Sequence, residues 1–309
     1  MYNAGLILEG GGMRGVYTAG VLDAFLDAGI EFSSVYGVSA GSCHACSYLS
    51  KQRGRAFRVN VDYLDDPNYC GAKTFLKTGN VFGPEMLYEQ IPDDLEHILQ
   101  RCIFELYYPI HDDRQEIVLN LLNPFDHQAF LNYPGKFYAV VTDVETGAAR
   151  YLRVRDLRKQ MWMIRSSSSL PLVSKTIVVK GHKLLDGGIA DSIPIRKSIE
   201  DGNEKNVVIL TRDHGYRKAP NKLMPIMRLR YPKYKEFLHA METRHVRYNE
   251  TIDFLEEQEK EGKVFIIRPE AKVEVGRIEK DKAKLTVLYK QGLHDGEKAI
   301  EAMKEYLEK

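Results

Sequence analysis

The sequence predicts a three-layer α/β fold, in which a mostly parallel central sheet carries helices on both faces. Short apolar runs that end in glycine alternate with stretches whose apolar residues recur at helical spacing. This alternation is typical of parallel strands joined by crossover helices. The chain of 309 residues is 44% hydrophobic and 28% charged, and this length allows a sizeable core.

The first part of the chain shows the alternation twice. Residues 5–8 predict a buried strand, and the glycines at 10–12 turn the chain. Apolar residues then recur at helical spacing from Val16 to Leu26, and Gly29 can end that helix. Residues 35–38 predict a second strand, and residues 40–49 a second helix.

The middle of the chain is less regular. We expect residues 55–135 to form a helical insertion over the core, a candidate lid, with helices at 93–105 and 115–122. Hairpins are predicted from residues 137–142 with 150–154, and from 176–179 with 183–185. Between the hairpins, residues 156–165 predict a helix with Asp156 as its N-cap.

Two parts of the chain are expected from this pattern. Residues 1–211 would form the α/β core and end after a buried strand at 207–210. Residues 212–309 would form a mostly helical C-terminal extension packed on the core, with an apolar run of core-strand type at 264–267. Residues 282–308 predict either one long amphipathic helix or a pair of helices around Gly292.

Composition narrows the class of protein. The formal net charge of +1 gives no indication of a nucleic-acid partner. Cys43 and Cys46 form a C-x-x-C, but no second pair follows, so buried helix residues are favoured over a redox or metal site. No signal-peptide pattern opens the chain, and no apolar stretch approaches the roughly 18 residues of a membrane-spanning helix. We expect a cytoplasmic protein; the sequence does not indicate an oligomeric state.

A glycine loop between the first strand and helix comprises Gly10, Gly11, Gly12, Met13, Arg14 and Gly15. Its backbone N–H groups can stabilise negative charge, either a phosphate or a reaction oxyanion. The loop satisfies G-x-G-x-x-G, so a nucleotide-binding oxidoreductase is one alternative. However, the second strand does not end in the acidic residue that a dinucleotide ribose requires.

The second strand ends instead in Gly37-Val38-Ser39-Ala40-Gly41, a G-x-S-x-G between strand and helix. This context is typical of a nucleophile elbow, which presents a serine hydroxyl at the carboxyl end of the sheet. The alternative is an ordinary turn with Ser39 as an N-cap. A second glycine loop, expected at the same sheet edge, favours the nucleophile.

A serine nucleophile requires a base, and two schemes are open. In the α/β-hydrolase scheme an acid such as Asp186 is followed by a histidine, for which the chain offers His214, His239, His245 and His294. That fold has several strands before the elbow, whereas here there is one. In the other scheme Asp186, in the turn Asp186-Gly187-Gly188, accepts the serine proton directly.

Together these elements resemble the patatin-like phospholipase family, whose members carry G-G-G-x-R-G, then G-x-S-x-G, then D-G-G or D-G-A. The matching segments here are residues 9–15, 37–41 and 186–188, and the serine-rich stretch 166–171 is similar to the family's segment before the aspartate. The resemblance covers about residues 5–211. Glu9 departs from the commoner Asp, and Ser192 from the commoner Asn.

The resemblance implies a serine acyl hydrolase with a lipid or acyl-ester substrate, no cofactor and no metal. Ser39 would attack the acyl carbonyl, and Asp186 would be its base. Backbone N–H groups around Gly11, Gly12 and Met13 would hold the oxyanion, with Arg14 bracing the loop. A catalytically idle binding protein with the same fold is a further alternative.

A basic and apolar segment follows the predicted core. Such a mixture suits the surface of an anionic membrane, so we expect a peripheral membrane contact near residues 212–235; an exposed loop and helix face is the simpler interpretation. The basic residues are Arg212, Arg217, Lys218, Lys222, Arg228, Arg230, Lys233 and Lys235, and the interleaved apolar ones are Met224, Met227, Leu229, Tyr231 and Tyr234.

Overall fold

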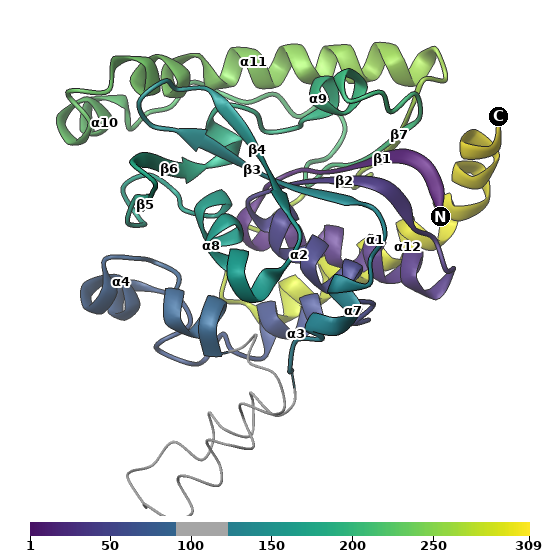
Figure 1. Cartoon of the computed structure of the whole chain (residues 1–309), viewed down its shortest axis with the longest axis horizontal. Coiled ribbons are helices and arrows are strands. Elements are labelled where there is room, and N and C mark those ends of the chain that lie inside the picture. The colour runs from purple at the N-terminus through teal and green to yellow at the C-terminus, as the bar shows by residue number, and fades with distance from the viewer. Residues whose placement is uncertain (91–122) are drawn as a thin grey trace, which may run out of the picture.

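The computed structural model describes residues 1–90 and 123–309, and its centre is one mostly parallel sheet (Figure 1). The strand order is β5-β6-β3-β2-β1-β7-β8, with β4 paired to β3. The pairs β1–β2, β1–β7, β2–β3 and β7–β8 are parallel. The strands are β1 (Tyr2–Leu8), β2 (Phe32–Val38), β3 (Lys136–Asp143), β4 (Ala149–Val154), β5 (Ile177–Val179), β6 (His182–Asp186), β7 (Asn206–Ile209) and β8 (Val264–Ile267).

Helices cover both faces of this sheet, as the sequence predicts. In Figure 1, α9 and α11 lie along one face, and α1, α2, α8 and α12 lie on the other. The longer helices are α1 (Val16–Asp27), α2 (Ala40–Leu49), α8 (Leu157–Ser167), α11 (Lys235–Lys260) and α12 (Lys282–Glu308). The shorter ones are η1 (Gly12–Gly15), α3 (Arg55–Val61), α4 (Ala72–Thr78), η2 (Met86–Gln90), α7 (His127–Leu131), η3 (Gly187–Ile189), α9 (Ile195–Glu200) and α10 (Met224–Arg230).

Alternation along β1 explains the two-sided core. Leu6 and Leu8 are fully buried among residues of α1, α2 and α12. Ile7, between them, is fully buried in a different cluster with Tyr248 and Ile252 of α11. Since successive side chains of a strand point to opposite faces, the buried residues 4–8 of β1 must be apolar on both faces, and they are, whereas Asn3 near its start is exposed.

The C-terminal helix α12 is a single helix rather than a pair divided at Gly292. Gly292 is buried against α1, where a Cβ would clash with the carbonyl oxygen of Tyr17. The glycine therefore permits close packing of two helices and does not break α12. The predicted strand at 264–267 is β8, which extends the sheet beyond β7.

Most predicted elements of the core are confirmed. The second strand begins three residues earlier than expected, at Phe32. Asp156 caps α8 as predicted, because its side chain accepts a hydrogen bond from the Arg158 N–H at 3.0 Å. The helices expected at 93–105 and 115–122 lie outside the described residues.

The register of β3 brings two sheet segments to one point. Val38, the last residue of β2, pairs with Val140 of β3, and the next residue, Val141, pairs with Asp186 at the end of β6. The opposite edge of β3 is paired with β4 at the same residues. β6 therefore pairs with the same edge of β3 as β2 does, just beyond the point where β2 ends. The residue after β2, Ser39, therefore meets the last residue of β6.

Candidate active site

Ser39 sits in a strained turn between β2 and α2. Its φ is 54° and its ψ is −122°, in a region where non-glycine residues cost about 1–3 kcal/mol. The flanking glycines make the turn sterically feasible, because a Cβ on Gly41 would clash with the carbonyl of Leu8 and one on Gly37 with Ser42. This is the geometry of a nucleophile elbow.

The serine-rich end of α8 braces both halves of the site. Ser167 Oγ accepts a hydrogen bond from the Ser39 N–H at 2.9 Å. The carbonyl of Ser169 accepts one from the Asp186 N–H at 2.8 Å. The end of α8 and the residues that follow it therefore contact both the turn at Ser39 and the turn at Asp186. These two hydrogen bonds link the backbones of the two residues through one segment.

Asp186 is buried with one carboxylate oxygen available. Its Oδ1 accepts the Gly188 N–H at 2.8 Å, whereas Oδ2 has no hydrogen-bond partner among the described residues. Burial raises the pKa of Asp186, and the nearby Ser39 hydroxyl and Arg244 lower it by less. The hydroxyl is close enough to act on this pKa, although it makes no fully formed bond to Oδ2. A carboxylate with a raised pKa and a free oxygen is a competent proton acceptor.

The glycine loop beside Ser39 offers unengaged donors. The backbone N–H groups of Gly10, Gly11 and Gly12 meet no acceptor in the described part of the chain. Met13 differs, because its N–H donates to the carbonyl of Arg277 at 3.0 Å. In this conformation the N–H groups of Gly11 and Gly12 are available to an acceptor from outside the protein, whereas that of Met13 is engaged.

Glu9 holds the loop to the sheet edge. Its Oε2 accepts hydrogen bonds from the N–H and the hydroxyl of Thr211, at 2.7 and 3.0 Å. Its Oε1 accepts the Tyr248 hydroxyl at 2.9 Å. Both oxygens are thus occupied, and the end of β1 is tied to the end of β7 and to α11. The other departure from the family pattern, Ser192, donates to the Gly188 carbonyl at 2.7 Å.

Two cavities of opposite character meet at Ser39. One has a volume of about 30 Å³ and a polar lining that includes Gly10, Gly11, Gly12 and Asp186. The other, of about 100 Å³, is mainly apolar and is lined by Met13, Val59, Tyr69, Phe82, Leu87, Tyr88 and Leu170, among others. A further cavity of about 70 Å³ shares Val59, Leu87 and Tyr88 with it and continues toward Phe125 and Met161. The hydroxyl therefore lies between a polar and an apolar compartment.

Five cations line the polar cavity, and local sequence patterns point to only some of them. Arg14 belongs to the glycine loop, and Arg212 and Lys218 belong to the basic segment assigned above to a membrane surface. Arg244 on α11 and Arg277 before α12 were not anticipated. No local motif marks them, since the fold brings them in from far along the chain.

The histidines of the triad scheme lie elsewhere. His214, His239, His245 and His294 line neither of the two cavities that contain Ser39. His44, one helical turn beyond Ser39, does line the apolar cavity and is 3% exposed. Burial lowers the pKa of His44 to about 4, so it is neutral near pH 7.

Within residues 1–90 and 123–309, no group of three or more His, Cys, Asp or Glu side chains could hold a metal ion. No helix in the same ranges has the length and apolar character needed to cross a bilayer. Cys43, Cys46 and Cys70 are free cysteines, and Cys46 and Cys70 are buried.

Comparison with known proteins gives the family. The chain is 29% identical over 211 residues to "Uncharacterized protein YjjU" of Escherichia coli, covering 67% of this chain and 51% of that protein. It is 26% identical over 197 residues to "Lysophospholipase nte1" of Aspergillus niger, covering 62% of this chain and 11% of the relative. It thus spans about half of the first relative and about a tenth of the second.

A solved structure of VipD from Legionella pneumophila is similar with a TM-score of 0.48 and 11% identity, over 99% of this chain and 67% of that one. A sequence model described as "Domain of unknown function (DUF6363)" matches residues 234–308. The model described as "Patatin-like phospholipase" matches residues 6–198, well over half of the chain. The chain therefore belongs to the patatin-like phospholipase family.

Proposed function

We propose that the protein is a serine lipid acyl hydrolase that uses a Ser39–Asp186 dyad. The observation that carries this proposal is the position of Ser39 between an apolar and a polar cavity. An acyl chain fits the apolar cavity, and the alcohol part of the ester would then extend into the polar one. Membership of the patatin-like phospholipase family supports a lipid hydrolase, and one relative is named a lysophospholipase.

The chemistry follows from the groups at the site. Ser39 Oγ attacks the acyl carbon while its proton passes to Asp186 Oδ2. The carbonyl oxygen becomes an oxyanion beside the N–H groups of Gly11 and Gly12, and each such donor contributes roughly a hundredfold in rate. Collapse expels the alcohol, which takes the proton from Asp186, and leaves an acyl-enzyme. Asp186 then takes a proton from water, whose oxygen attacks the acyl carbon, and Ser39 Oγ leaves with the proton from Asp186 as the carboxylic acid is released.

The test is turnover of a panel of lysophospholipids, phospholipids and p-nitrophenyl acyl esters by the purified protein, together with labelling by a fluorophosphonate. We expect ester hydrolysis and labelling at Ser39. A protein that hydrolyses no member of the panel and resists the fluorophosphonate would be the idle binding protein instead. The nucleotide-binding alternative is not favoured by the family comparison.

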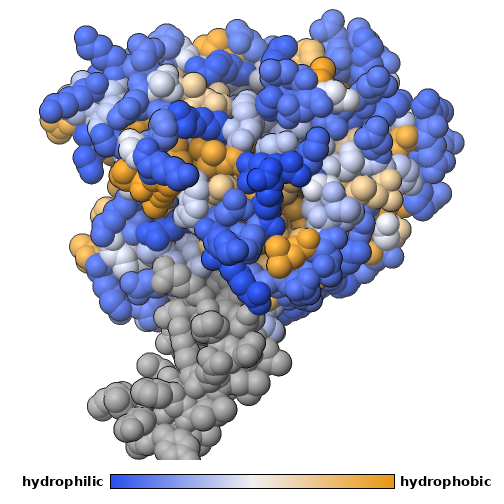
Figure 2. All heavy atoms as spheres, in the orientation of Figure 1, coloured by the Kyte–Doolittle hydropathy of each residue, from blue (hydrophilic) through white to orange (hydrophobic). Residues whose placement is uncertain are grey.

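We also propose that α10 contacts a membrane surface. It buries Met224 and Met227 against the core but exposes Ile226 by 51% and Leu229 by 83%. Exposed basic residues flank this apolar face, namely Lys222, Arg228 and Arg230. Figure 2 shows further hydrophobic side chains at the surface where β5 and β6 lie in the view of Figure 1. Apolar and basic groups together suit an anionic interface.

Replacing Ile226 and Leu229 together by serine should weaken sedimentation with vesicles that contain anionic lipid by about tenfold, because two large aliphatic side chains no longer enter the interface. The matched control is Val287→Ser, which changes a 68% exposed residue on α12, on the other side of the sheet. Vesicle binding that is equal in both variants, or independent of anionic lipid, would contradict the proposal.

A further inference from the structure

The polar cavity at Ser39 has an excess of positive charge. Its lining includes Arg14, Arg212, Lys218, Arg244 and Arg277, here called the cationic cluster, and two carboxylates, Glu9 and Asp186. Four of the five cations lie beyond residues 6–198, the range that matches the family model. The cluster is therefore a property of the C-terminal part of this chain added to the family's site.

The two carboxylates offset only part of the positive charge of the cluster, because five cations line the cavity and, in the described part of the chain, no second pair of carboxylates does. Both oxygens of Glu9 are engaged by Thr211 and Tyr248, and Asp186 Oδ1 is engaged by Gly188. Among the described residues, none of the five cations forms an ion pair with a carboxylate. Uncompensated like charges in one small cavity are unfavourable unless an anion joins them.

Arg14 is the most deeply placed member. It is 6% exposed, and its Nε has no hydrogen-bond partner in the described part of the chain. Burial and the neighbouring Arg212 lower its pKa to about 10. Arg14 lines the cavity, so this unpaired N–H can donate to an acceptor on a bound ligand.

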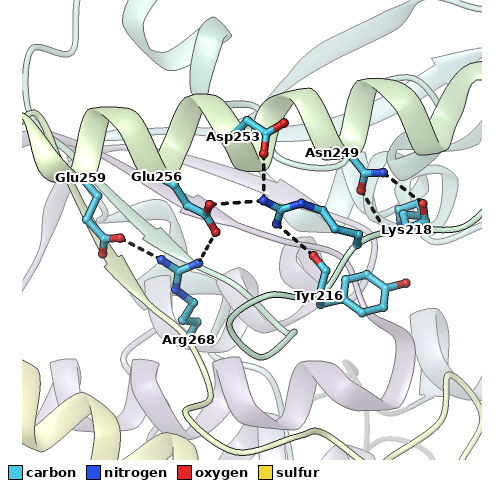
Figure 3. Close-up of polar contacts among 8 residues, drawn as sticks. Tyr216, Lys218, Asn249, Asp253, Glu256, Glu259 and Arg268 are labelled. Carbon is cyan, nitrogen blue, oxygen red and sulfur yellow. Dashed lines mark hydrogen bonds and ion pairs between the residues drawn. The ribbon is translucent and has the colours of Figure 1, made fainter.

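The backbone of Lys218 is held to α11. Its backbone N–H donates to Asn249 Oδ1 at 2.8 Å, and its carbonyl accepts from Asn249 Nδ2 at 3.1 Å (Figure 3). Its Nζ lies 4.0 Å from the ring centre of Tyr248. Burial and the charge of Arg244 lower its pKa to about 7, so a bound anion would strengthen its protonated form.

The neighbouring residue fixes the same loop to α11. Arg217 bonds to Asp253 at 2.8 Å and to Glu256 at 3.3 Å, and Arg268 joins Glu256 and Glu259 on the same helix (Figure 3). These ion pairs tie the loop to α11, and Lys218 of the same loop lines the cavity. Arg244, from α11 itself, donates through Nε to the carbonyl of Gly188, beside Asp186.

We propose that the cationic cluster binds the phosphate group of the substrate, an acyl ester that carries phosphate a few atoms from the scissile bond, as in an acylated glycerol phosphate. The inference rests on the function proposed above and names its substrate class. Guanidinium groups suit phosphate because their paired N–H donors match its oxygens. Phosphate binding at this cluster would also give the C-terminal part of the chain a role, since Arg244 and Arg277 would supply two of the phosphate ligands.

The test compares two monomeric substrates with the same acyl chain, 1-hexanoylglycerol 3-phosphate and 1-hexanoylglycerol. Such short chains stay in solution, so binding to a lipid surface does not contribute. We expect kcat/KM to be at least about thirtyfold higher for the phosphate ester, and this ratio to fall as salt screens the cluster. Hydrolysis of both esters at similar rates would overturn the inference and leave the proposed function standing.

The variants Arg277→Gln and Lys218→Met should each lower that ratio by about tenfold, because one charge-assisted contact is lost. Arg277→Gln keeps the backbone carbonyl that accepts the Met13 N–H, and its side chain is exposed, so folding should persist. The matched control is Lys272→Gln, which changes an exposed cation of the same segment outside the cavity lining. An unchanged ratio in both cavity variants would overturn the inference.

Calorimetry separates the inference from catalysis. Glycerol 3-phosphate should bind the wild-type protein about tenfold more tightly than it binds Arg277→Gln, whether or not any ester is turned over. Inorganic phosphate serves as the second ligand. If it binds as tightly as glycerol 3-phosphate, the site holds free phosphate and the assignment to a lipid head group is wrong; if neither ligand binds, the cluster is not an anion site.

Discussion

Ser39→Ala should lower kcat for p-nitrophenyl butyrate by about 10⁴-fold or more, the scale on which removal of a catalytic serine acts in other hydrolases. The loss is large because the Ser39 hydroxyl forms and then releases the covalent acyl-enzyme, and no neighbouring hydroxyl occupies the elbow. The hydroxyl oxygen of Ser167 accepts a hydrogen bond from the Ser39 backbone N–H, so Ser167 supports the elbow and does not replace the nucleophile. The measurement is steady-state turnover, with the fluorophosphonate adduct located by mass spectrometry.

The control for this variant is Ser192→Ala. Ser192 lines the same polar cavity but donates to the Gly188 carbonyl and does not lie in the elbow, so we expect a change of less than about tenfold. Thermal unfolding of both variants shows whether they remain folded; Ala at the strained φ of Ser39 keeps the same backbone requirement. Ser39→Ala with wild-type turnover would contradict the proposed nucleophile.

Local sequence patterns were sufficient for the parts of this molecule that local physics determines. The alternation of residues 5–8 and 35–38 with helical spacing predicts the parallel sheet, since each run must fit a buried strand or a one-sided helix. The G-x-S-x-G turn is recognisable because its close contacts to Leu8 and Ser42 exclude side chains at both glycines. Asp156 was recognisable as an N-cap for the same kind of local reason.

What the sequence did not reveal depends on long-range register and packing. No residue near Asp186 indicates that β6 pairs with the same edge of β3 as β2 does, just beyond the end of β2. That register nevertheless brings Asp186 to Ser39. Gly292 was ambiguous because a helix break and a close helix contact both favour glycine, and only the packing of α1 on α12 decides between them. Arg244 and Arg277 belong to no motif, because their proximity to Ser39 arises only when the chain folds.

Asp186→Asn is the variant with the second large expected effect, a fall in kcat of about 10²–10⁴-fold, because the amide cannot take the Ser39 proton. The substitution is nearly isosteric, and the amide oxygen can still accept the Gly188 N–H. Burial raises the pKa of Asp186, which means that folding disfavours its charged form. We therefore expect the melting temperature near pH 7 to stay the same or to rise while activity is lost, a combination that simple structural damage would not produce.

The pH dependence of kcat/KM also tests whether Asp186 is the base. The base acts only when ionised, so kcat/KM for a neutral short-chain ester should fall as pH decreases through the raised pKa of Asp186. That inflection should lie above about 3.9, the usual pKa of an aspartate. Histidine variants distinguish the dyad from a triad, because a triad requires a histidine at Ser39. The structure favours the dyad, since His214, His239, His245 and His294 line neither cavity at Ser39. Each of these residues changed to glutamine should retain activity within about twofold of wild type and the same profile; a histidine variant as inactive as Asp186→Asn would replace the dyad with a triad.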